Sequence, residues 1–176
     1  MVHYRRNLVA GGTYFFTITL QDRRSSFLID HIDALRSALR QIRGDRPFVI
    51  DAIVVLPEHF HMMRTLPSHD ADYSGRMCAI KSRFTQSLVR RDAAIRRNEK
   101  GEYNLWQRRF WEHTIRGDDD YQRHVDYIHY NPVKHGYVEK VCDWQYSSFH
   151  RYVRKGFLPI EWAGESAAFE KNAFGE

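Results

Sequence analysis

The chain has 176 residues, of which 43% are hydrophobic and 28% are charged, as is typical of one globular domain with a full core. Its two cysteines, Cys78 and Cys142, lack CxxC spacing, which excludes a disulfide framework and a cysteine zinc site. No apolar run approaches the roughly 20 residues that span a bilayer, and the first residues lack the apolar core of a signal peptide. We therefore expect a cytoplasmic protein with no membrane partner.

The positive charge is concentrated before the C-terminal end. The whole chain carries a net charge of +5, whereas residues 161–176 contain four glutamates and one lysine, so the first 160 residues carry about +8. Such a field attracts polyanions, and the aromatic share of 14% offers surfaces on which bases could stack. Charge alone favours a nucleic-acid partner only slightly over a basic surface that keeps the protein in solution.

The first predicted elements are a strand and a helix. Residues 13–20 are rich in β-branched and aromatic side chains, which predicts a strand. Apolar positions at helical spacing predict a helix over residues 30–43, with Asp30 as its N-cap. We expect Gly44 and Pro47 to end this helix.

The middle of the chain predicts two strands, a helix and a loop. Residues 48–56 are strongly apolar and indicate a buried strand, and a turn then leads to a second strand that carries His59 and His61. An amphipathic helix is expected over residues 73–89. The charged, turn-like residues 90–104 predict an exposed loop.

The last part predicts a short strand and two helices. We expect a strand at residues 109–114 and a helix over residues 119–131, which Pro132 should stop because proline disfavours helical geometry in the residue before it. A final helix is expected over residues 144–155. Strands interspersed with helices indicate an α+β fold in layers.

His59 and His61 flank Phe60 directly after an apolar run. Successive side chains of a strand point to opposite faces, so both imidazoles share one face while Phe60 points into the core. Two imidazoles at one strand end predict a metal site that needs further ligands. Because chance pairs of strand histidines are more common than metal sites, this pair gains weight only together with other residues.

Tyr127 and Asn131 lie one turn apart on the same face of the predicted helix, and His124 falls on nearly the same face. Asn131 is therefore a candidate third ligand, and imidazoles mixed with a hard oxygen favour Mg²⁺ or Mn²⁺ over structural zinc. Each residue has an ordinary alternative, with Tyr127 as a half-buried helix aromatic and Asn131 as a turn residue before Pro132.

The chemistry that suits such a site is phosphodiester cleavage. The metal would polarise the scissile phosphate, and the Tyr127 oxygen would attack phosphorus to leave a covalent phosphotyrosine. A free phenol has a pKa of about 10 and needs help to ionise at neutral pH. His124 and His129 are candidates for that help because they are close in sequence.

Several blocks of sequence carry a resemblance to a known family. They are Tyr4-Arg5-Arg6 with Gly11-Gly12-Thr13-Tyr14-Phe15-Phe16-Thr17, Pro57-Glu58-His59-Phe60-His61, Trp106-Gln107-Arg108-Arg109-Phe110-Trp111-Glu112-His113, Tyr127-Ile128-His129-Tyr130-Asn131-Pro132-Val133-Lys134-His135-Gly136, and Asp143-Trp144 with Ser147-Ser148-Phe149-His150. In this order they resemble the signature motifs of the REP-associated tyrosine transposases. The resemblance covers about residues 4–163.

The resemblance implies a single-tyrosine transposase fold, with a central antiparallel sheet and helices on its faces in a ferredoxin-like or RRM-like arrangement. It implies that His59 and His61 bind a divalent cation with Asn131, and that Tyr127 is the nucleophile. The implied substrate is single-stranded DNA with a palindromic hairpin, the repetitive extragenic palindrome (REP), which such enzymes cut and rejoin. We assign residues 1–163 to the catalytic domain and residues 164–176 to an acidic tail.

Basic residues near these motifs are the candidate DNA contacts, because gripping a hairpin requires contacts to its phosphates. The set comprises Arg5, Arg6, Arg23, Arg24, Lys81, Arg108, Arg109 and His124. We expect a monomer that works at the nucleoid, with the dimer of related insertion-sequence transposases as the alternative.

Two other functions remain open from the sequence. One is a non-catalytic protein that grips hairpins with its sheet and basic residues. The other is a hydrolytic metallonuclease in which water replaces the tyrosine as the attacking group.

Overall fold

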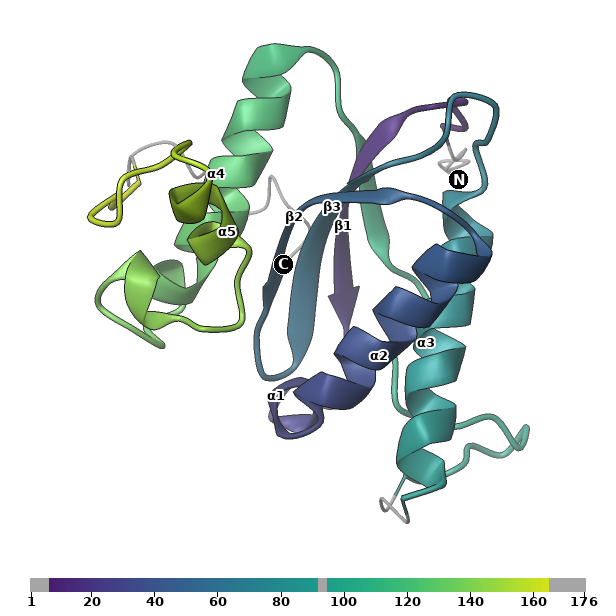
Figure 1. Ribbon diagram of the computed structural model, residues 1–176. Helices are drawn as coiled ribbons and strands as arrows, with labels where there is room; N and C mark the ends of the chain where they lie inside the picture. Colours follow the sequence, from purple (N-terminus) through teal and green to yellow (C-terminus); the bar gives the residue numbers. More distant parts are fainter. Residues whose placement is uncertain (1–6, 92–94, 165–176) are drawn as a thin grey trace, which may run out of the picture.

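Within residues 7–91 and 95–164, which the computed structural model describes, four strands form an antiparallel sheet with helices on both faces (Figure 1). The strands lie in the order β2-β3-β1-β4, with bounds β1 (Thr13–Thr19), β2 (Val49–Val55), β3 (His59–Thr65) and β4 (Trp111–Thr114). The helices are α1 (Phe27–Asp30), α2 (Ile32–Asp45), α3 (Tyr73–Val89), α4 (Asp118–Lys134) and α5 (Phe149–Arg154), with a 3-10 turn η1 (Val141–Asp143). The predicted α+β fold is confirmed.

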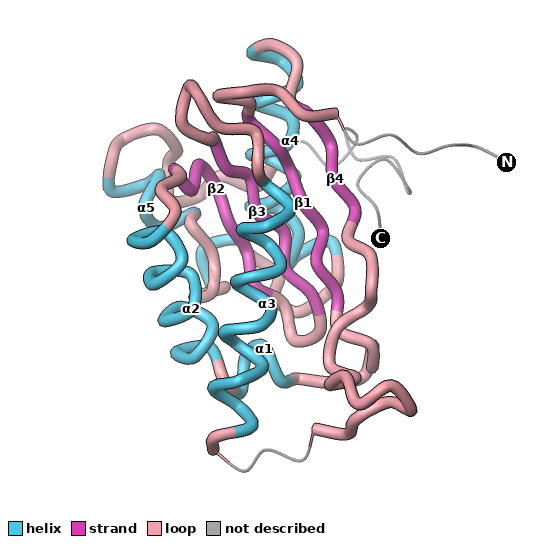
Figure 2. Tube along the Cα trace, turned by 90° about the vertical axis from the view of Figure 1, so that its right-hand side faces the viewer, coloured by secondary structure: helices cyan, strands magenta, loops and turns pink. Residues whose placement is uncertain are grey.

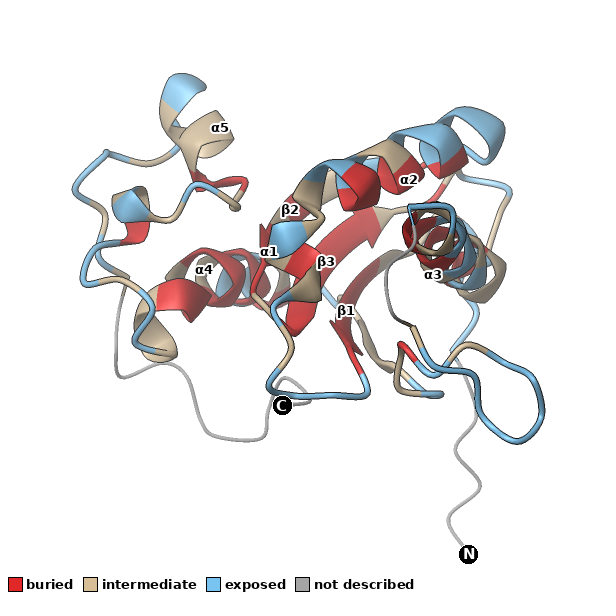
Figure 3. Cartoon of the chain, turned by 90° about the horizontal axis from the view of Figure 1, so that it is seen from below, coloured by how far each residue is buried: buried red, intermediate tan, exposed pale blue. Residues whose placement is uncertain are grey.

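The sheet separates two apolar layers. Helices α2 and α3 lie on one face and α4 on the other (Figure 2), and buried residues gather on the strands and on the inner sides of the helices (Figure 3). Phe16 and Met62 pack toward α2 and α3, whereas Phe15 and Met63 pack with Tyr127 of α4. Successive residues along β1, and along β3, therefore belong to opposite layers.

The register of the sheet fixes the histidine pair. In the antiparallel pairing of β1 with β3, Thr17 lies opposite His61 and Thr19 lies opposite His59. Phe60, between the two histidines, packs into the layer under α2 and α3. Both imidazoles thus share one face of the sheet, as predicted. This is the face that α4 covers.

The edge strand β2 is partly covered by the chain that follows α4. Val55 N donates to the Tyr146 carbonyl at 2.8 Å, and Ser148 N donates to the Ile53 carbonyl at 2.8 Å. The expected helix over residues 144–155 is therefore wrong in its first part, since these residues pair with β2 and only Phe149–Arg154 is helical. Tertiary hydrogen bonds to an exposed strand edge outweigh the local helical preference.

The helix predicted over residues 30–43 begins and ends later. Asp30 closes the short α1, His31 precedes α2, and α2 continues through Gly44 to Asp45. A glycine in a helix costs only about 1 kcal/mol relative to alanine, and the bond from Arg46 N to the Ile42 carbonyl at 2.8 Å holds the last turn.

Pro132 does not stop α4, which continues to Lys134. Its ring removes one helical donor near the C-terminal end, while the buried face of α4 remains packed on β2 and β3. The helix ends instead at Lys134, and Gly136, which has a φ of 71°, forms the turn that follows His135. Gly136 N donates to the Val133 carbonyl and Tyr137 N to the Pro132 carbonyl, both at 3.0 Å, as in a Schellman motif.

The predicted acidic tail lies outside the described residues apart from Gly164, as do Arg5 and Arg6. The predicted α3 and the short strand β4 are confirmed, with α3 at the expected bounds. In the part of the chain that the structure describes, every helix is too short or too polar to cross a membrane.

The helix end at Gly136 gives a first prediction. Gly136→Ala should lower the free energy of unfolding by about 1 kcal/mol, because an L residue is strained at this positive φ. Gly44→Ala is the matched control, since nothing lies within 4 Å of the added carbon and the site is helical; it should stabilise the protein by about 0.5–1 kcal/mol. Urea denaturation measures both changes, and equal effects would contradict the assigned helix end.

Candidate active site

His59 and His61 lie side by side on the α4 face of β3. Both side chains are fully buried, their ring centroids are 4.9 Å apart, and the rings are nearly perpendicular, at 79°. A strand places i and i+2 on one face, and the antiparallel neighbours on β1 hold that strand in register.

The Nδ1 atom of each histidine has a polar partner. His59 Nδ1 donates to Glu58 Oε1 at 2.9 Å, and His61 Nδ1 lies 2.9 Å from Thr17 Oγ1. Such partners fix the tautomer and orientation of an imidazole and leave Nε2 as the ligand atom, the arrangement usual around metal-binding histidines.

Glu58 is held as a carboxylate by its surroundings. Its Oε1 is 3.7 Å from the Arg23 guanidinium, and its Oε2 accepts a hydrogen bond from the Tyr137 hydroxyl at 3.3 Å. Burial alone would raise the pKa of Glu58, but the hydrogen bond and charge of His59, together with Arg23, outweigh burial, so the pKa is lowered. Arg23, one of the predicted DNA contacts, therefore lies at the margin of the histidine pair.

Helix α4 presents one face to the two histidines. The Tyr127 ring lies 5.2 Å from the His61 ring, and the His135 ring lies 5.3 Å from the His59 ring. Residues at i, i+4 and i+8 share a helical face, so Asn131 lies on α4 between these two contacts. The strand and the helix, which are far apart in sequence, thus meet, as the family resemblance implies and as spacing alone could not show.

The residues at this meeting point suit a divalent cation. Nε2 of His59 and Oδ1 of Asn131 are buried polar atoms that make no hydrogen bond within the described part of the chain. Two imidazole nitrogens and an amide oxygen are donors that Mg²⁺ or Mn²⁺ accepts. The residues present therefore fit such an ion.

The Tyr127 hydroxyl has a cationic neighbour. Lys134 Nζ donates to Tyr127 Oη at 3.0 Å and lies 4.7 Å from the centre of its ring. Tyr127 itself is 1% exposed and packs edge-on against Phe15. Its hydroxyl is thus directed to a polar group of α4 rather than into packed hydrocarbon.

The structure does not place His124 or His129 beside the Tyr127 hydroxyl. His124 Nδ1 donates to the Asp120 carbonyl at 2.7 Å, and its ring stacks on His113. His129 Nε2 is hydrogen-bonded to Ser148 Oγ at 3.0 Å. The group that contacts the Tyr127 hydroxyl is instead Lys134, which lies two turns after Tyr127 on the same face.

A second group of donors comprises His113, Asp120 and His124, whose ligand atoms all lie within 4.8 Å of one another. Hydrogen bonds already engage this cluster, because His113 Nε2 donates to Asp120 Oδ2 at 2.8 Å and Arg116 N donates to the same oxygen at 2.8 Å. Burial raises the pKa of Asp120, but these bonds and the two histidines outweigh it and lower the pKa. The cluster joins β4 to the first turn of α4.

The predicted DNA contacts differ in accessibility. Arg24, Arg108 and Arg109 are exposed, and Arg24 lies 3.9 Å from the exposed Asp22. Lys81 is tied to the Gln107 carbonyl at 2.9 Å, and burial lowers its pKa. His124 is only 4% exposed. Lys81 and His124 are thus less accessible than the three arginines, and their contact with DNA stays a prediction.

Three residues of the site were missed from sequence. Lys134 and His135 were overlooked because Pro132 was expected to end the helix, although their spacing of seven and eight from Tyr127 is helical. Glu58 was assigned to a turn, although a carboxylate beside a strand histidine is a frequent orienting partner of a metal ligand.

Comparisons with known proteins agree with this geometry. Residues 9–131 match the family described as "Transposase IS200 like". An Escherichia coli protein called REP-associated tyrosine transposase is 48% identical over 169 residues, which cover 96% of this chain and 95% of the relative. A Haemophilus influenzae protein with the same family name is 49% identical over 166 residues, which cover 93% of this chain and 94% of the relative.

A solved structure, described as a REP-associated tyrosine transposase bound to a REP hairpin, superposes with a TM-score of 0.87 at 46% identity. The match covers 100% of this chain and 98% of the other. The chain therefore belongs to the IS200-like transposases, and within them to the REP-associated tyrosine transposases. It is thus an enzyme that nicks and joins DNA.

The burial of His129 gives a prediction for pH dependence. Burial, with a smaller effect of Arg151, lowers the pKa of His129 to about 3, whereas an unfolded histidine titrates near 6.5. The unfolded chain therefore binds more protons between these values, and stability should fall as pH decreases below about 6.5, by at most about 1.4 kcal/mol per pH unit for this group.

Urea denaturation from pH 7.5 to 4.5 measures this slope. His129→Gln should flatten it, while the same change at the exposed His69 should leave it as in the wild type. Parallel pH profiles for wild type and His129→Gln would contradict the assignment.

Proposed function

We propose that the protein is a metal-dependent single-stranded DNA endonuclease and strand transferase that nicks and rejoins REP hairpins through a covalent phosphotyrosine. The observation that carries this proposal is the packing of the Tyr127 ring against the His61 ring, with centroids 5.2 Å apart. The Lys134 ammonium lies 3.0 Å from the phenol oxygen. The proposed nucleophile thus lies beside a side-chain cation and one histidine of the pair.

We infer that His59, His61 and Asn131 hold the ion, which would be Mg²⁺ or Mn²⁺. When bound, such an ion would polarise the scissile phosphate and offset its developing charge. Glu58 and Thr17 orient the two imidazoles through their Nδ1 atoms. Partners on Nδ1 leave Nε2 of each imidazole as the ligand atom.

Tyr127 would carry the reaction. Its phenol gives its proton to water, and the oxygen forms a bond to phosphorus as the bond from phosphorus to the leaving DNA oxygen breaks. The leaving oxygen takes a proton from water and departs as a hydroxyl. The Lys134 ammonium donates to that phenol oxygen and so favours its anionic form. Attack of a DNA hydroxyl on the phosphotyrosine reverses the step and rejoins a strand.

The relative solved with a REP hairpin supports a hairpin substrate for this chain, since the match at 46% identity extends over its whole length. Exposed arginines, including Arg23 at 47% side-chain exposure beside Glu58, provide charge for phosphates near the site. We further propose that the enzyme acts as a monomer and works at the nucleoid, where such palindromes are found.

Replacement of Tyr127 tests the nucleophile. Tyr127→Phe should form no covalent adduct with a labelled REP hairpin in Mg²⁺ or Mn²⁺, while hairpin affinity is retained. Tyr121→Phe is the control on the same helix, because its hydroxyl bonds Asp51 at 3.3 Å instead, and it should form the adduct. Denaturing gels measure the adduct.

Three outcomes would count against the proposal. Adduct formed by Tyr127→Phe would remove the assigned nucleophile. Wild type that binds hairpins without cutting them would indicate the non-catalytic binder. Free 5′-phosphate ends made equally by wild type and Tyr127→Phe would indicate the hydrolytic nuclease.

Replacement of His61 tests the metal ligands. His61→Ala should abolish cutting and Mn²⁺ binding, measured by electron paramagnetic resonance, yet keep most hairpin affinity, because phosphate contacts dominate it. The same change at His59 should behave alike. His113→Ala is the control and should keep Mn²⁺ bound; loss of the ion from His113→Ala alone would move the metal site to the second cluster.

A further inference from the structure

The segment that follows α4 returns to the strand end that carries His59. Within this segment the Tyr137 ring has two aromatic neighbours, with centroids 6.2 Å away at His135 and 5.4 Å away at Trp144. These contacts hold the ring in place. The Tyr137 hydroxyl donates a hydrogen bond to Glu58 Oε2 at 3.3 Å.

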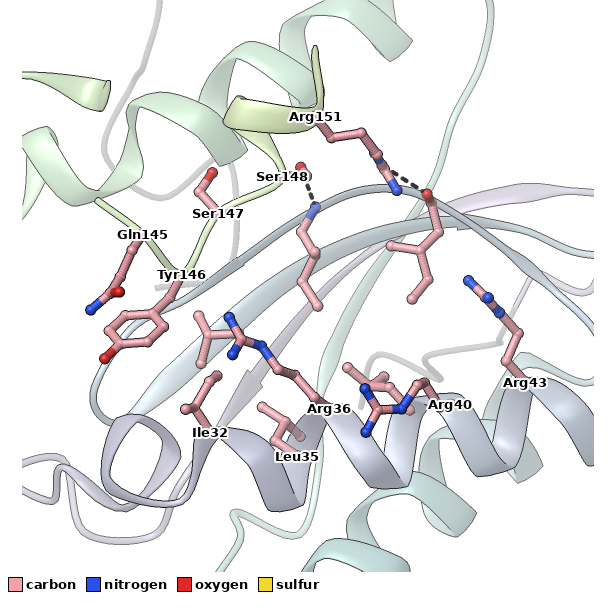
Figure 4. A pocket seen from close by; sticks show the side chains of 14 residues that line it. Ile32, Leu35, Arg36, Arg40, Arg43, Gln145, Tyr146, Ser147, Ser148 and Arg151 are labelled. Atoms are coloured by element: carbon pink, nitrogen blue, oxygen red, sulfur yellow. Dashed lines mark hydrogen bonds between the residues drawn. The ribbon is translucent and has the colours of Figure 1, made fainter. Parts of the chain in front are cut away.

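The same segment is fixed to the edge strand β2 beyond Tyr137. Trp144 Nε1 donates to the Val55 carbonyl at 3.0 Å. Further along, Ser148 Oγ accepts a hydrogen bond from Ile53 N at 2.9 Å (Figure 4). The Tyr137 ring therefore packs on a part of the chain that is itself anchored to the sheet.

Glu58 joins this segment to the histidine pair. The Glu58 side chain is 9% exposed, and its two oxygens have different partners. Oε1 accepts a hydrogen bond from His59 Nδ1 at 2.9 Å, and Oε2 accepts the one from Tyr137. The terminal torsion of a glutamate is soft, so a carboxylate bonded through one oxygen can rotate, whereas bonds to both oxygens fix its plane. The direction of the His59 imidazole therefore depends on Tyr137 through Glu58.

Arg23 gives weaker support to the same carboxylate. Its guanidinium lies 3.7 Å from Glu58 Oε1, which is too long for a hydrogen bond, and its side chain is 47% exposed. Solvent screens such a pair, so it contributes little. Tyr137 is thus the group that holds the Glu58 oxygen that His59 does not use.

We propose that Tyr137 is a positioning residue of the ion site and acts on His59 through Glu58. The inference rests on the proposed function, in which His59, His61 and Asn131 hold Mg²⁺ or Mn²⁺. Removal of the direct partner of a metal-binding histidine commonly weakens ion binding by about 10-fold to 100-fold. Tyr137 is one step further from the ion, so its effect should be smaller.

The test measures the Kd of Mn²⁺ for the full chain without DNA, by electron paramagnetic resonance. Tyr137→Phe should raise this Kd by about threefold, which is within the range of one net hydrogen bond. The ring stays in place and only the hydroxyl is lost. Tyr146→Phe is the matched control and should leave the Kd unchanged, because it removes a hydroxyl from the same segment on the side that faces Arg36 of α2 (Figure 4).

A double-variant cycle separates positioning from a general loosening of the fold. Glu58→Ala should raise the Kd by about 10-fold to 100-fold. Because Tyr137 acts through Glu58, Tyr137→Phe should have no further effect on the Kd in the Glu58→Ala protein. A change that merely loosened the fold would add its full effect in both proteins.

An unchanged or lower Kd for Tyr137→Phe would overturn the inference, as would the same increase for Tyr146→Phe or additive effects in the cycle. The proposed ion site fails separately. Mn²⁺ that is lost in His61→Ala but bound by Tyr137→Phe with the wild-type Kd would overturn the role of Tyr137 alone. Wild type that binds no Mn²⁺ would overturn the ion site as well.

Discussion

The packing of α4 across β3 is the constraint on which the site depends. Alternation along β3 directs His59 and His61 to one face, and the helical repeat directs Tyr127 and His135 toward them. Neither element alone forms a site. Burial of these polar groups is costly unless they are hydrogen-bonded, and Glu58 and Thr17 supply bonds to the two imidazoles. The orientation of the two imidazoles thus depends on the sheet register and on the Glu58 carboxylate.

Much of the fold could be predicted because its signals are local. Strand composition and helical periodicity predicted β1, β2 and α3 almost at their bounds. The errors lie where tertiary contacts override local preference, at Pro132 inside α4 and at residues 144–148 along the β2 edge. The first error also excluded Lys134 from the predicted site. A helix that ends at Asn131 would not place the Lys134 side chain on the same face as the Tyr127 oxygen.

The histidine pair could be proposed from spacing, but its meeting with Tyr127 could not, because nothing in a strand pattern tells which helix covers which face. The surroundings of Lys81 could not be predicted either, because its bond to the Gln107 carbonyl joins two segments that are far apart in sequence.

The most direct test of the central claim is anomalous diffraction from crystals of the protein with Mn²⁺ and a hairpin carrying an uncleavable phosphate. The account predicts a manganese peak bound by His59, His61 and Asn131, with the Tyr127 oxygen facing the scissile phosphate. A peak confined to His113, Asp120 and His124, or a Tyr127 hydroxyl that remains out of reach of that phosphate, would contradict it.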